Sequence, residues 1–255
     1  MPSQIMTSQL RIATYNIHKG FSFFKHRMVI HEMRDQLRAL GADVVFLQEV
    51  QGVHARHARR FVDWPRQPQH EFLADSIWSD FAYGKNAVYD NGHHGNAVLS
   101  RFPIVRWDNE DISEHRYESR GLLHCEIAIP GWSEVLHCVC VHLGLLARHR
   151  KLQMRAICAR IDRLVPDCAP LIVAGDFNDW RHLAGAGLAR PLGLKEVFED
   201  THGRPARSFP AAMPFLRLDR IYVRGFEIEH VHVHHGHPWQ RFSDHAALTA
   251  SITRA

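Results

Sequence analysis

The chain is predicted to be an α/β protein, a four-layer α/β sandwich in which two packed mixed β-sheets are flanked by helices. Three observations predict this class. Apolar runs of strand length outnumber helical segments, short turns join several of these runs as hairpins, and at least one strand-helix-strand unit is present. A purely parallel sheet would need a crossover connection between neighbouring strands, so two mixed sheets fit the pattern better.

Length and composition favour one domain. The 255 residues are 45% hydrophobic and 23% charged, which allows a full core. We expect a single domain over residues 1–255, with residues 1–9 as a flexible N-terminus, and a monomer. The formal charge of +4, with 21 histidines counted as neutral, indicates a mildly basic surface that suits an anionic substrate.

Cysteine usage and the N-terminus bear on the compartment. The five cysteines are odd in number and form no Cys-x-x-Cys pair, although Cys138 and Cys140 share one face of an expected strand. We therefore expect reduced, buried thiols. Residues 1–10 lack the pattern of a signal peptide, and no apolar stretch is long enough to span a bilayer. These features predict a cytoplasmic protein without a transmembrane segment.

The first elements form a strand-helix-strand unit. Residues 10–15 and 43–47 are apolar runs that end at Asn16 and at Gln48-Glu49, so each run places a polar side chain at a strand end. A helix is expected between them, followed by Gly41 as a stop signal. Its apolar positions at near-helical spacing are Met28, Met33, Leu37 and Leu40.

The middle of the chain alternates loop, strands and one long helix. Residues 51–70, rich in His, Arg, Pro and Gln, are expected to form a long surface loop. Residues 96–100, 121–129 and 135–143 are expected strands, the last two joined by a turn at Pro130-Gly131. A helix is expected over residues 146–165. Its core stripe would be Met154, Ile157, Ile161 and Leu164, with Arg148, Arg150, Lys151 and Arg155 on its surface.

The last third repeats the pattern of apolar runs with polar ends. Residues 171–174 are expected to form a buried strand, after which Gly175 lets the backbone turn so that Asp176 and Asn178 project from its end. A helical or loop stretch follows. Residues 216–223, 226–233 and 246–252 are expected as closing strands. Ligands in open α/β sheets bind at such strand ends.

Acidic side chains recur at these ends. Singly, Glu49, Asp176, Asp219 and Asp244 would each be an ordinary surface acid or helix cap. Together, several carboxylates in one small site need a cation or a proton to offset their repulsion. Because the donors are oxygens and no thiolate cluster is present, Mg²⁺ is the expected ion, with Mn²⁺ as the alternative.

Six short motifs together resemble the endonuclease/exonuclease/phosphatase superfamily, and they occur in that family's order from residue 10 to residue 252. The segments 16–21 and 92–96 look closest to a bacterial branch of YbhP-like proteins. The motifs are Ala13-Thr14-Tyr15-Asn16, Val45-Phe46-Leu47-Gln48-Glu49-Val50, Asn96-Ala97-Val98-Leu99-Ser100-Arg101, Gly175-Asp176-Phe177-Asn178, Arg217-Leu218-Asp219-Arg220 and Ser243-Asp244-His245.

The resemblance implies a role for each matching residue. Glu49 would be the main metal carboxylate, with Asn16 beside it and Asp244 near the same ion. Asp176 would orient or deprotonate the attacking water, and Asn178 would hold a phosphate oxygen. The remaining implied roles are phosphate donation by His245, orientation of its ring by Asp219, and a phosphate or leaving-group contact by His142.

These roles meet the needs of phosphodiester hydrolysis: a cation to offset charge, a carboxylate to orient water, and donors aimed at the phosphoryl oxygens. Without the resemblance, His142 would be taken as a structural histidine. His18 and Lys19 would contact phosphate or form a turn, and Arg101 would be structural. The histidines at positions 230, 232, 234, 235 and 237 resemble a metal tract but also fit the exposed face of an edge strand.

Substrate class is the open question. The positive charge and the Arg/His-rich segment 51–66 place a phosphodiesterase acting on nucleic acid, a nuclease, slightly ahead. The alternatives are a phospholipid or sphingomyelin-type phosphodiesterase and a phosphomonoesterase. An apolar lip for a lipid headgroup could come from Phe21, Phe23, Phe24, Trp78 and Phe81, which fit a core equally well. A catalytically silent phosphate-binding module would leave gaps in the motif set, and none is found. A nucleotide-loop enzyme is disfavoured because no glycine-rich phosphate loop follows a strand.

Overall fold

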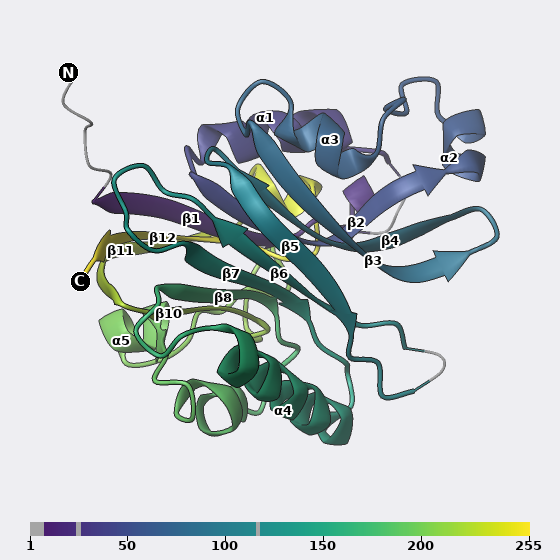
Figure 1. Cartoon of the computed structure of the whole chain (residues 1–255). Coiled ribbons are helices and arrows are strands. Elements are labelled where there is room, and N and C mark those ends of the chain that lie inside the picture. Colours follow the sequence, from purple (N-terminus) through teal and green to yellow (C-terminus); the bar gives the residue numbers. More distant parts are fainter. Residues whose placement is uncertain (1–7, 24–26, 116–117) are drawn as a thin grey trace, which may run out of the picture.

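The computed structural model describes residues 8–23, 27–115 and 118–255. Two six-stranded mixed sheets pack face to face, with helices on both outer faces, which confirms the predicted four-layer sandwich (Figure 1). The strand order is β11-β12-β1-β2-β4-β3 in the first sheet and β5-β6-β7-β8-β10-β9 in the second. The pairs β1·β2 and β7·β8 are parallel and the others antiparallel.

The strands take their bounds from the apolar runs. The first sheet contains β1 (Gln9–Asn16), β2 (Val44–His54), β3 (Asp80–Tyr89), β4 (Gly92–Ser100), β11 (Phe226–His234) and β12 (Ala247–Arg254). The second contains β5 (Ile104–Asp111), β6 (Gly121–Ile127), β7 (Leu136–His142), β8 (Leu171–Asp176), β9 (Lys195–Glu196) and β10 (Asp219–Arg224).

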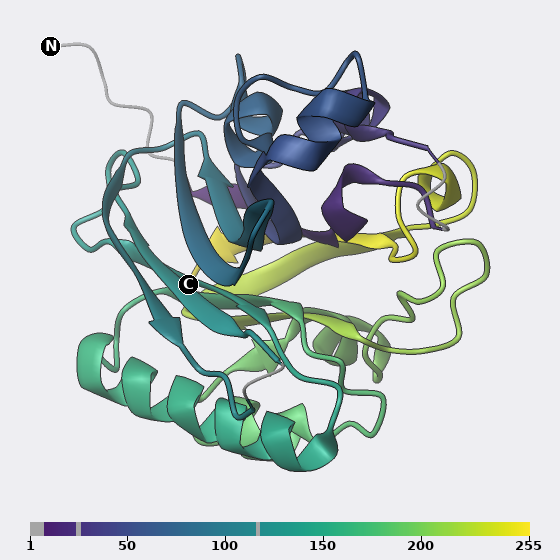
Figure 2. The same ribbon diagram turned by 90° about the vertical axis from the view of Figure 1, so that its right-hand side faces the viewer.

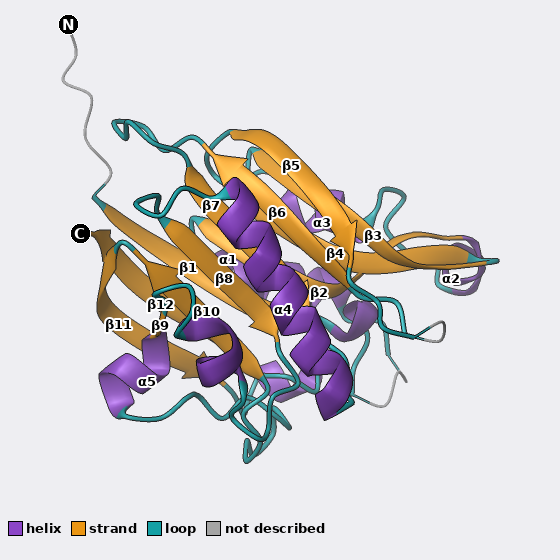
Figure 3. Cartoon of the chain, turned by 60° about the horizontal axis from the view of Figure 1, so that its bottom comes forward, coloured by secondary structure: helices purple, strands orange, loops and turns teal. Residues whose placement is uncertain are grey.

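Helices cover the two outer faces. The α-helices are α1 (Ile30–Ala39), α2 (Ala55–Arg60), α3 (Gln69–Ala74), α4 (Ala147–Leu164) and α5 (Val197–His202), and three short helical turns are η1 (His18–Gly20), η2 (Gly185–Ala189) and η3 (Trp239–Arg241). Helices α1 and α3 lie over the first sheet, while α4 crosses the second, as Figures 1 and 3 show. None of the helices in the described residues is long and apolar enough to cross a bilayer.

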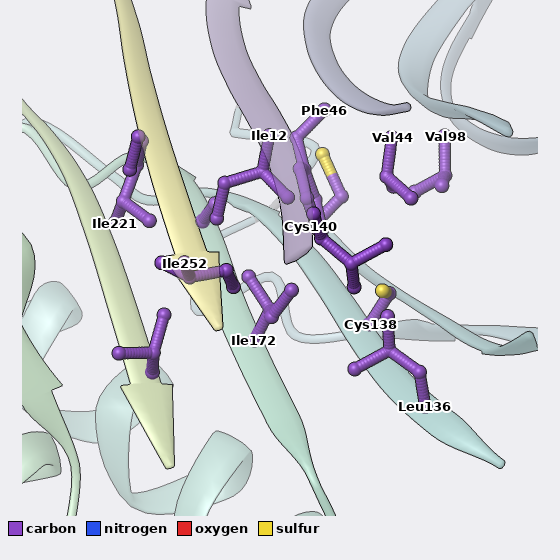
Figure 4. Close-up of a cluster of buried hydrophobic side chains, with 14 of the residues drawn as sticks. Ile12, Val44, Phe46, Val98, Leu136, Cys138, Cys140, Ile172, Ile221 and Ile252 are labelled. Carbon is purple, nitrogen blue, oxygen red and sulfur yellow. The ribbon is translucent and has the colours of Figure 1, made fainter. Parts of the chain in front are cut away.

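Three apolar layers hold the sandwich together. The central layer lies between the sheets and includes Ile12, Phe46, Cys140 and Ile172, all fully buried (Figure 4). A second layer packs α1 and α3 against the first sheet, and a third packs α4 against the second. Because successive strand residues point to opposite faces, strands buried on both sides read as continuous apolar runs.

Strand pairing brings the polar strand ends to one edge. In the first sheet Asn16 pairs with Gln48, next to Glu49. In the second, Asp176 pairs with both His142 and Asp219. The close approach of β7 to β8 requires Gly175: it has φ +149°, and a Cβ there would lie 1.9 Å from the carbonyl oxygen of Val141. Gly175, which was expected to turn the backbone after the strand, lies within β8.

The expected loop at residues 51–70 is wrong. Strand β2 continues to His54, which pairs with Gly92, and α2 follows at once because the His54 side chain accepts a hydrogen bond from the backbone N–H of His57 (3.1 Å). Helix α3 then begins at Gln69. The polar composition of the segment therefore hid a strand extension and two short helices.

Three smaller expectations also change. Arg150 is buried instead of lying on the surface of α4, and Leu164 is 37% exposed instead of in the core. Gln9 begins β1 and pairs with Thr253, while residues 1–7 of the expected flexible N-terminus lie outside the described residues. All five cysteines are free; Cys125, Cys138 and Cys140 are buried as expected, whereas Cys158 is half-buried and Cys168 is exposed.

Candidate active site

Asp176 lies at the centre of the polar cluster. It ends β8 and is 1% exposed. One carboxylate oxygen accepts from the amide of Asn16 (3.1 Å) and lies 3.4 Å from Nε2 of His142 and 3.7 Å from Nε2 of His245. The other accepts from the backbone N–H of Asn178 (2.9 Å). Burial raises the pKa of Asp176 to about 6, although the positive charge of His245 opposes the rise.

His245 and Asp219 form a buried ion pair. Nδ1 of His245 lies 2.9 Å from Oδ2 of Asp219, which holds the ring in one orientation. Burial alone would lower the pKa of His245, but the carboxylates of Asp219 and Asp176 raise it to about 10. The imidazole is therefore a cation at neutral pH, with Nε2 directed to the side of Asp176.

The two asparagines hold backbone as well as side chains. Asn178 has a left-handed backbone (φ 48°), and its amide donates to the carbonyl of Leu143 (2.9 Å), which ties the loop after β8 to the loop after β7. Among the described residues its second N–H has no partner, so it can donate to a phosphate oxygen. The amide oxygen of Asn16 accepts from the backbone N–H of His18 (3.1 Å). That bond shapes the turn that brings His18 and Lys19 to the site.

Glu49 faces the ammonium group of Lys19. Nζ of Lys19 lies 3.4 Å from its carboxylate. Burial would raise the pKa of Glu49, but the ammonium of Lys19 is the largest opposing effect and the pKa falls to about 2, so the carboxylate is ionised. Its left-handed backbone (φ 56°) is uncommon for a residue with a side chain and marks a locally constrained position.

Asp244 lies on the other side of the same turn. Its carboxylate is 3.8 Å from Nδ1 of His18 and accepts from the hydroxyl of Ser243 (3.2 Å). That hydroxyl also donates to the carbonyl of Asn16 (2.7 Å), so the segment before β12 is attached to the end of β1. His18 therefore lies near Asp244 and is also close enough to Glu49 for an electrostatic interaction.

His142 is buried and neutral. It ends β7, and burial together with the positive charge of Arg120 lowers its pKa well below the usual range. A neutral imidazole 3.4 Å from Asp176 can donate a hydrogen bond without carrying charge. All eight predicted site residues therefore lie at one edge of the sandwich. Asn16, Asp176, Asp219, His142 and His245 make one connected cluster, Asn178 contacts it, and Glu49 and Asp244 flank it.

Two sets of residues could hold a metal ion. Asp176, Asp219 and His245 each offer a ligand atom, and these atoms lie within 4.8 Å of one another. However, Nδ1 of His245 is already paired to Asp219 and the ring is protonated, whereas a metal ligand must be neutral imidazole. Glu49 is the better donor, because it is ionised and its counter-charge is a lysine ammonium that a bound cation could replace.

Other residues of the site were not assigned by sequence reasoning. The buried hydroxyl of Ser208 accepts the backbone N–H of Asp219 (3.2 Å) and supports it from behind. His94 lies close enough to Glu49 to interact with its charge, and burial and Lys19 lower its pKa to about 4. His94 precedes the motif residue Asn96 by two positions on β4 and so shares its face, a signal that was present. Ser208 lies in an irregular segment and had none.

The histidine tract and Arg101 lie elsewhere. His230, His232 and His234 belong to β11, which is an edge strand, as the second of the two interpretations expected. His235 and His237 follow it. Within the described residues, these histidines form no group that could hold a metal. Arg101 lies 3.7 Å from Asp43, at the start of β2, which supports a structural role.

Comparison with known proteins agrees with this geometry. The Endonuclease/Exonuclease/phosphatase family model matches residues 13–245. YbhP of Escherichia coli, an uncharacterised protein, is 48% identical over 252 residues, with 99% of each chain covered. A Bacteroides vulgatus endonuclease/exonuclease/phosphatase superposes with a TM-score of 0.74 at 15% identity, covering 97% of this chain and 100% of its own.

A complex of D. rerio TDP2 with a single-strand DNA product superposes with a TM-score of 0.70 at 20% identity, covering 96% of this chain and 99% of its own. Similarity at this identity concerns the fold. The match of the family model to most of the chain, together with the YbhP relative, concerns the family. This chain belongs to the endonuclease/exonuclease/phosphatase family.

Proposed function

We propose that this protein is a divalent-metal-dependent phosphoesterase that hydrolyses phosphodiesters. One observation supports this above all others. A protonated His245, held by Asp219, lies beside the carboxylate of Asp176. A fixed cation next to a carboxylate whose pKa is about 6 provides a phosphate donor and a water-orienting base in one place.

Each of the other residues can take one role. Asp176 accepts a proton from water as the water oxygen bonds to phosphorus and the ester P–O bond breaks; solvent protonates the leaving oxygen. His245, Asn178 and neutral His142 donate to the phosphoryl oxygens. Asp219 keeps His245 charged and oriented. These donors are preorganised by hydrogen bonds to the backbone and to one another, which limits reorganisation during the reaction.

The metal would be held by Glu49, with Asn16 and Asp244 beside it, and Mg²⁺ or Mn²⁺ suits these oxygen donors. When bound, the ion would offset the negative charge of the phosphate and of the developing transition state. The ionised Glu49 and its lysine counter-ion support this assignment.

The similar solved structures do not indicate one substrate class for this chain. They include the TDP2 complex with single-strand DNA and a mannosyl-6-phosphatase of Bacteroides thetaiotaomicron, each under 25% identical to this chain. The nuclease interpretation rested partly on basic side chains in segment 51–66, which forms the end of β2, helix α2 and a short loop; its arginines at positions 56, 59, 60 and 66 are exposed. We therefore propose phosphodiester hydrolysis as the activity, with nucleic acid as one substrate to be tested.

The cytoplasm is the compartment that we propose, because all five cysteines are free and two of them, Cys138 and Cys140, lie in the core without forming a bridge. Cell fractionation with an antibody to the native chain tests this. Recovery in the periplasmic fraction would contradict it.

The test of the activity compares hydrolysis of bis-p-nitrophenyl phosphate and p-nitrophenyl phosphate with Mg²⁺, with Mn²⁺ and with EDTA. Wild type should cleave the diester only with metal. Asp176→Asn and His245→Ala should each reduce kcat by about 10²–10⁴-fold while the protein stays folded, since they remove contacts made in the transition state. Asp108→Asn is the matched control, because Asp108 is an exposed carboxylate on β5 that pairs with Arg160.

Faster hydrolysis of the monoester would make the protein a phosphomonoesterase. Near-normal rates in either site variant would contradict the proposed mechanism. Activity that persists in EDTA would contradict the proposed dependence on a metal ion.

A further inference from the structure

Three loops at the catalytic edge each expose a pair of large apolar side chains. The first loop follows β7 and His142, the second follows β8 and Asp176, and the third precedes β10 and Asp219. The apolar side chains lie three to seven positions in sequence from these site residues. The six side chains and their exposed fractions are Leu145 58%, Leu146 52%, Trp180 39%, Leu183 44%, Met213 77% and Phe215 60%. We call these six residues the apolar rim.

The rim belongs to one side of the active-site mouth. Strands β7, β8 and β10 are neighbours in the second sheet, and His142, Asp176 and Asp219 pair directly across them. Loops that leave these three positions must therefore emerge side by side around the catalytic cluster. Figure 2 shows the light green segment that contains Met213 and Phe215 projecting from the body of the protein next to the yellow segment before β12.

The loops are held in place by buried contacts. The guanidinium of Arg150, 1% exposed, donates to the carbonyls of Gly144 and Leu145 and stacks on the ring of Trp180 at 4.5 Å. It thus joins the first two loops. In the third, the backbone N–H of Phe215 donates to the carbonyl of Phe209 (2.9 Å). The apolar side chains therefore project from fixed backbone, which reduces the entropy lost on docking.

Unpaired arginines accompany the rim. Among the described residues, no carboxylate lies within 4.0 Å of the guanidinium of Arg148, Arg181, Arg204, Arg207 or Arg217. The last three, with Met213 and Pro214, line a groove of about 740 Å³ between α5, β11 and the third loop.

Exposed apolar side chains next to arginines without a carboxylate partner are typical of a protein surface that contacts lipid. Apolar side chains gain by entering the boundary between headgroups and acyl chains, and arginines gain from anionic headgroups. A nucleic-acid backbone would bind the arginines, but it would gain nothing from exposed Leu, Met and Phe side chains on the same loops. We propose that the apolar rim and its arginines dock the protein on an anionic phospholipid bilayer, so that the active site meets phosphodiesters of lipid headgroups.

This surface differs from the apolar lip considered from the sequence. Trp78 is 3% exposed, and its indole N–H donates to Ala42 at the opposite end of the first sheet. Phe81 is on β3, paired with Leu99, and Phe21 is 4% exposed. Phe23 is 41% exposed, and Phe24 lies outside the described residues. The substrate assignment rests on the proposed phosphodiesterase activity, whereas the docking itself does not.

Co-sedimentation of the whole protein with phosphatidylcholine vesicles, with and without phosphatidylglycerol, tests the docking, with EDTA present to prevent turnover. Wild type should bind the anionic vesicles. Met213→Ser/Phe215→Ser should lose most of this binding, and Arg204→Gln/Arg207→Gln should weaken it by about tenfold or more. Val105→Ser/Trp107→Ser is the matched control: both residues are at least half exposed but lie on β5, away from the catalytic edge.

Hydrolysis of bis-p-nitrophenyl phosphate, measured in parallel, separates the two proposals. Normal diester hydrolysis without vesicle binding would overturn the docking surface and leave the phosphodiesterase standing. Vesicle binding lost equally in the rim variant and in the β5 control would also overturn it. Selective loss in the rim variant, with the soluble diester still cleaved at the wild-type rate, is the expected result. If the rim variant instead loses cleavage of DNA and keeps vesicle binding, the surface serves nucleic acid and the proposal is wrong.

Discussion

At the scale of single residues, the site concentrates charge where burial would normally remove it. Asp176, Asp219 and His245 are each at least 94% buried, and a lone charge there would be neutralised by its desolvation cost. The imidazolium of His245 lies between the carboxylates of Asp176 and Asp219, and the attraction between these opposite charges offsets their desolvation cost. The pKa values of His245 and Asp176 consequently move in the directions that catalysis at neutral pH requires.

Asp219 can be tested through the pH profile. In wild type, the imidazolium of His245 is lost only as pH rises through its pKa of about 10. In Asp219→Asn the largest effect that raises this pKa is removed while burial still lowers it, so the charge is lost at lower pH. The alkaline limb of kcat for the diester should move down toward the usual histidine range. An alkaline limb that stays in place, as it should in the control Asp108→Asn, would contradict this role.

Glu49 can be tested through metal demand. Glu49→Gln removes one anionic oxygen next to Lys19 while keeping the size of the side chain. The Mg²⁺ concentration for half-maximal rate should rise by about tenfold or more, because charge on the ligands governs the affinity for hard cations. A magnesium titration of the diesterase rate measures it. An unchanged requirement would exclude Glu49 from the metal site.

At the scale of elements, strand ends determine which side chains meet, and the short helices around them are fixed by local caps. Helix α5 is an example, since the side chain of Glu196 accepts the backbone N–H of Glu199 (2.7 Å) at its start. Glu196 is buried, and burial raises its pKa to about 7 despite the attraction of Arg220. A helix cap is thereby linked to pH.

The sign of this linkage follows from the pKa values. The folded-state pKa of about 7 lies above the ordinary glutamate pKa of 4.5, so the folded state binds the proton more tightly. The contribution to stability is complete below the unfolded pKa and is lost as pH rises to about 7, by about 3 kcal/mol. Glu196→Gln should remove this decline from a plot of Tm against pH. The exposed control Asp200→Asn should keep it, and a decline that persists in Glu196→Gln would refute the linkage.

At the scale of the whole molecule, the active site exists because two sheets are held in register against each other. Glu49 and Asn16 come from the first sheet, and Asp176, Asp219 and His142 come from the second. Polar contacts also join the two sheets across the apolar layer. One is the buried amide of Asn96 on β4, which donates to the carbonyls of Gly121 (2.9 Å) and Cys140 (3.4 Å).

Asn96→Ala should therefore lower the stability of the entire domain. Loss of buried hydrogen bonds costs about 1–3 kcal/mol, and for a chain of this size each kcal/mol lowers Tm by about 2–4 °C. Calorimetry of the unfolding transition measures the effect. Asn91→Ala, in the exposed turn between β3 and β4, is the control and should unfold like wild type. Equal Tm values for the two variants would show that Asn96 does not join the sheets.

Much of the fold was readable from local patterns. Apolar runs predicted β1, β2, β4, β6, β7, β8, β10, β11 and β12, and the polar residues that end them predicted the catalytic edge. The apolar spacing before Gly41 predicted α1, and the amphipathic run from 146 to 165 predicted α4. The strand and helices in segment 51–70 were not predicted. They are stabilised by pairing with β4 and by the His54 cap, and neither produces a periodic pattern of apolar residues in the sequence.

The sequence by itself determined the sandwich, its strand ends and the residue types of the site, because these follow from hydrophobic periodicity and from polar residues placed where apolar runs stop. Only the tertiary structure decided that His245 is charged while His142 is neutral, that Arg150 is buried, and that the apolar rim lies on one side of the active-site mouth. The physical reason is that pKa values and exposure depend on desolvation and on neighbours far apart in the chain, which local patterns do not contain.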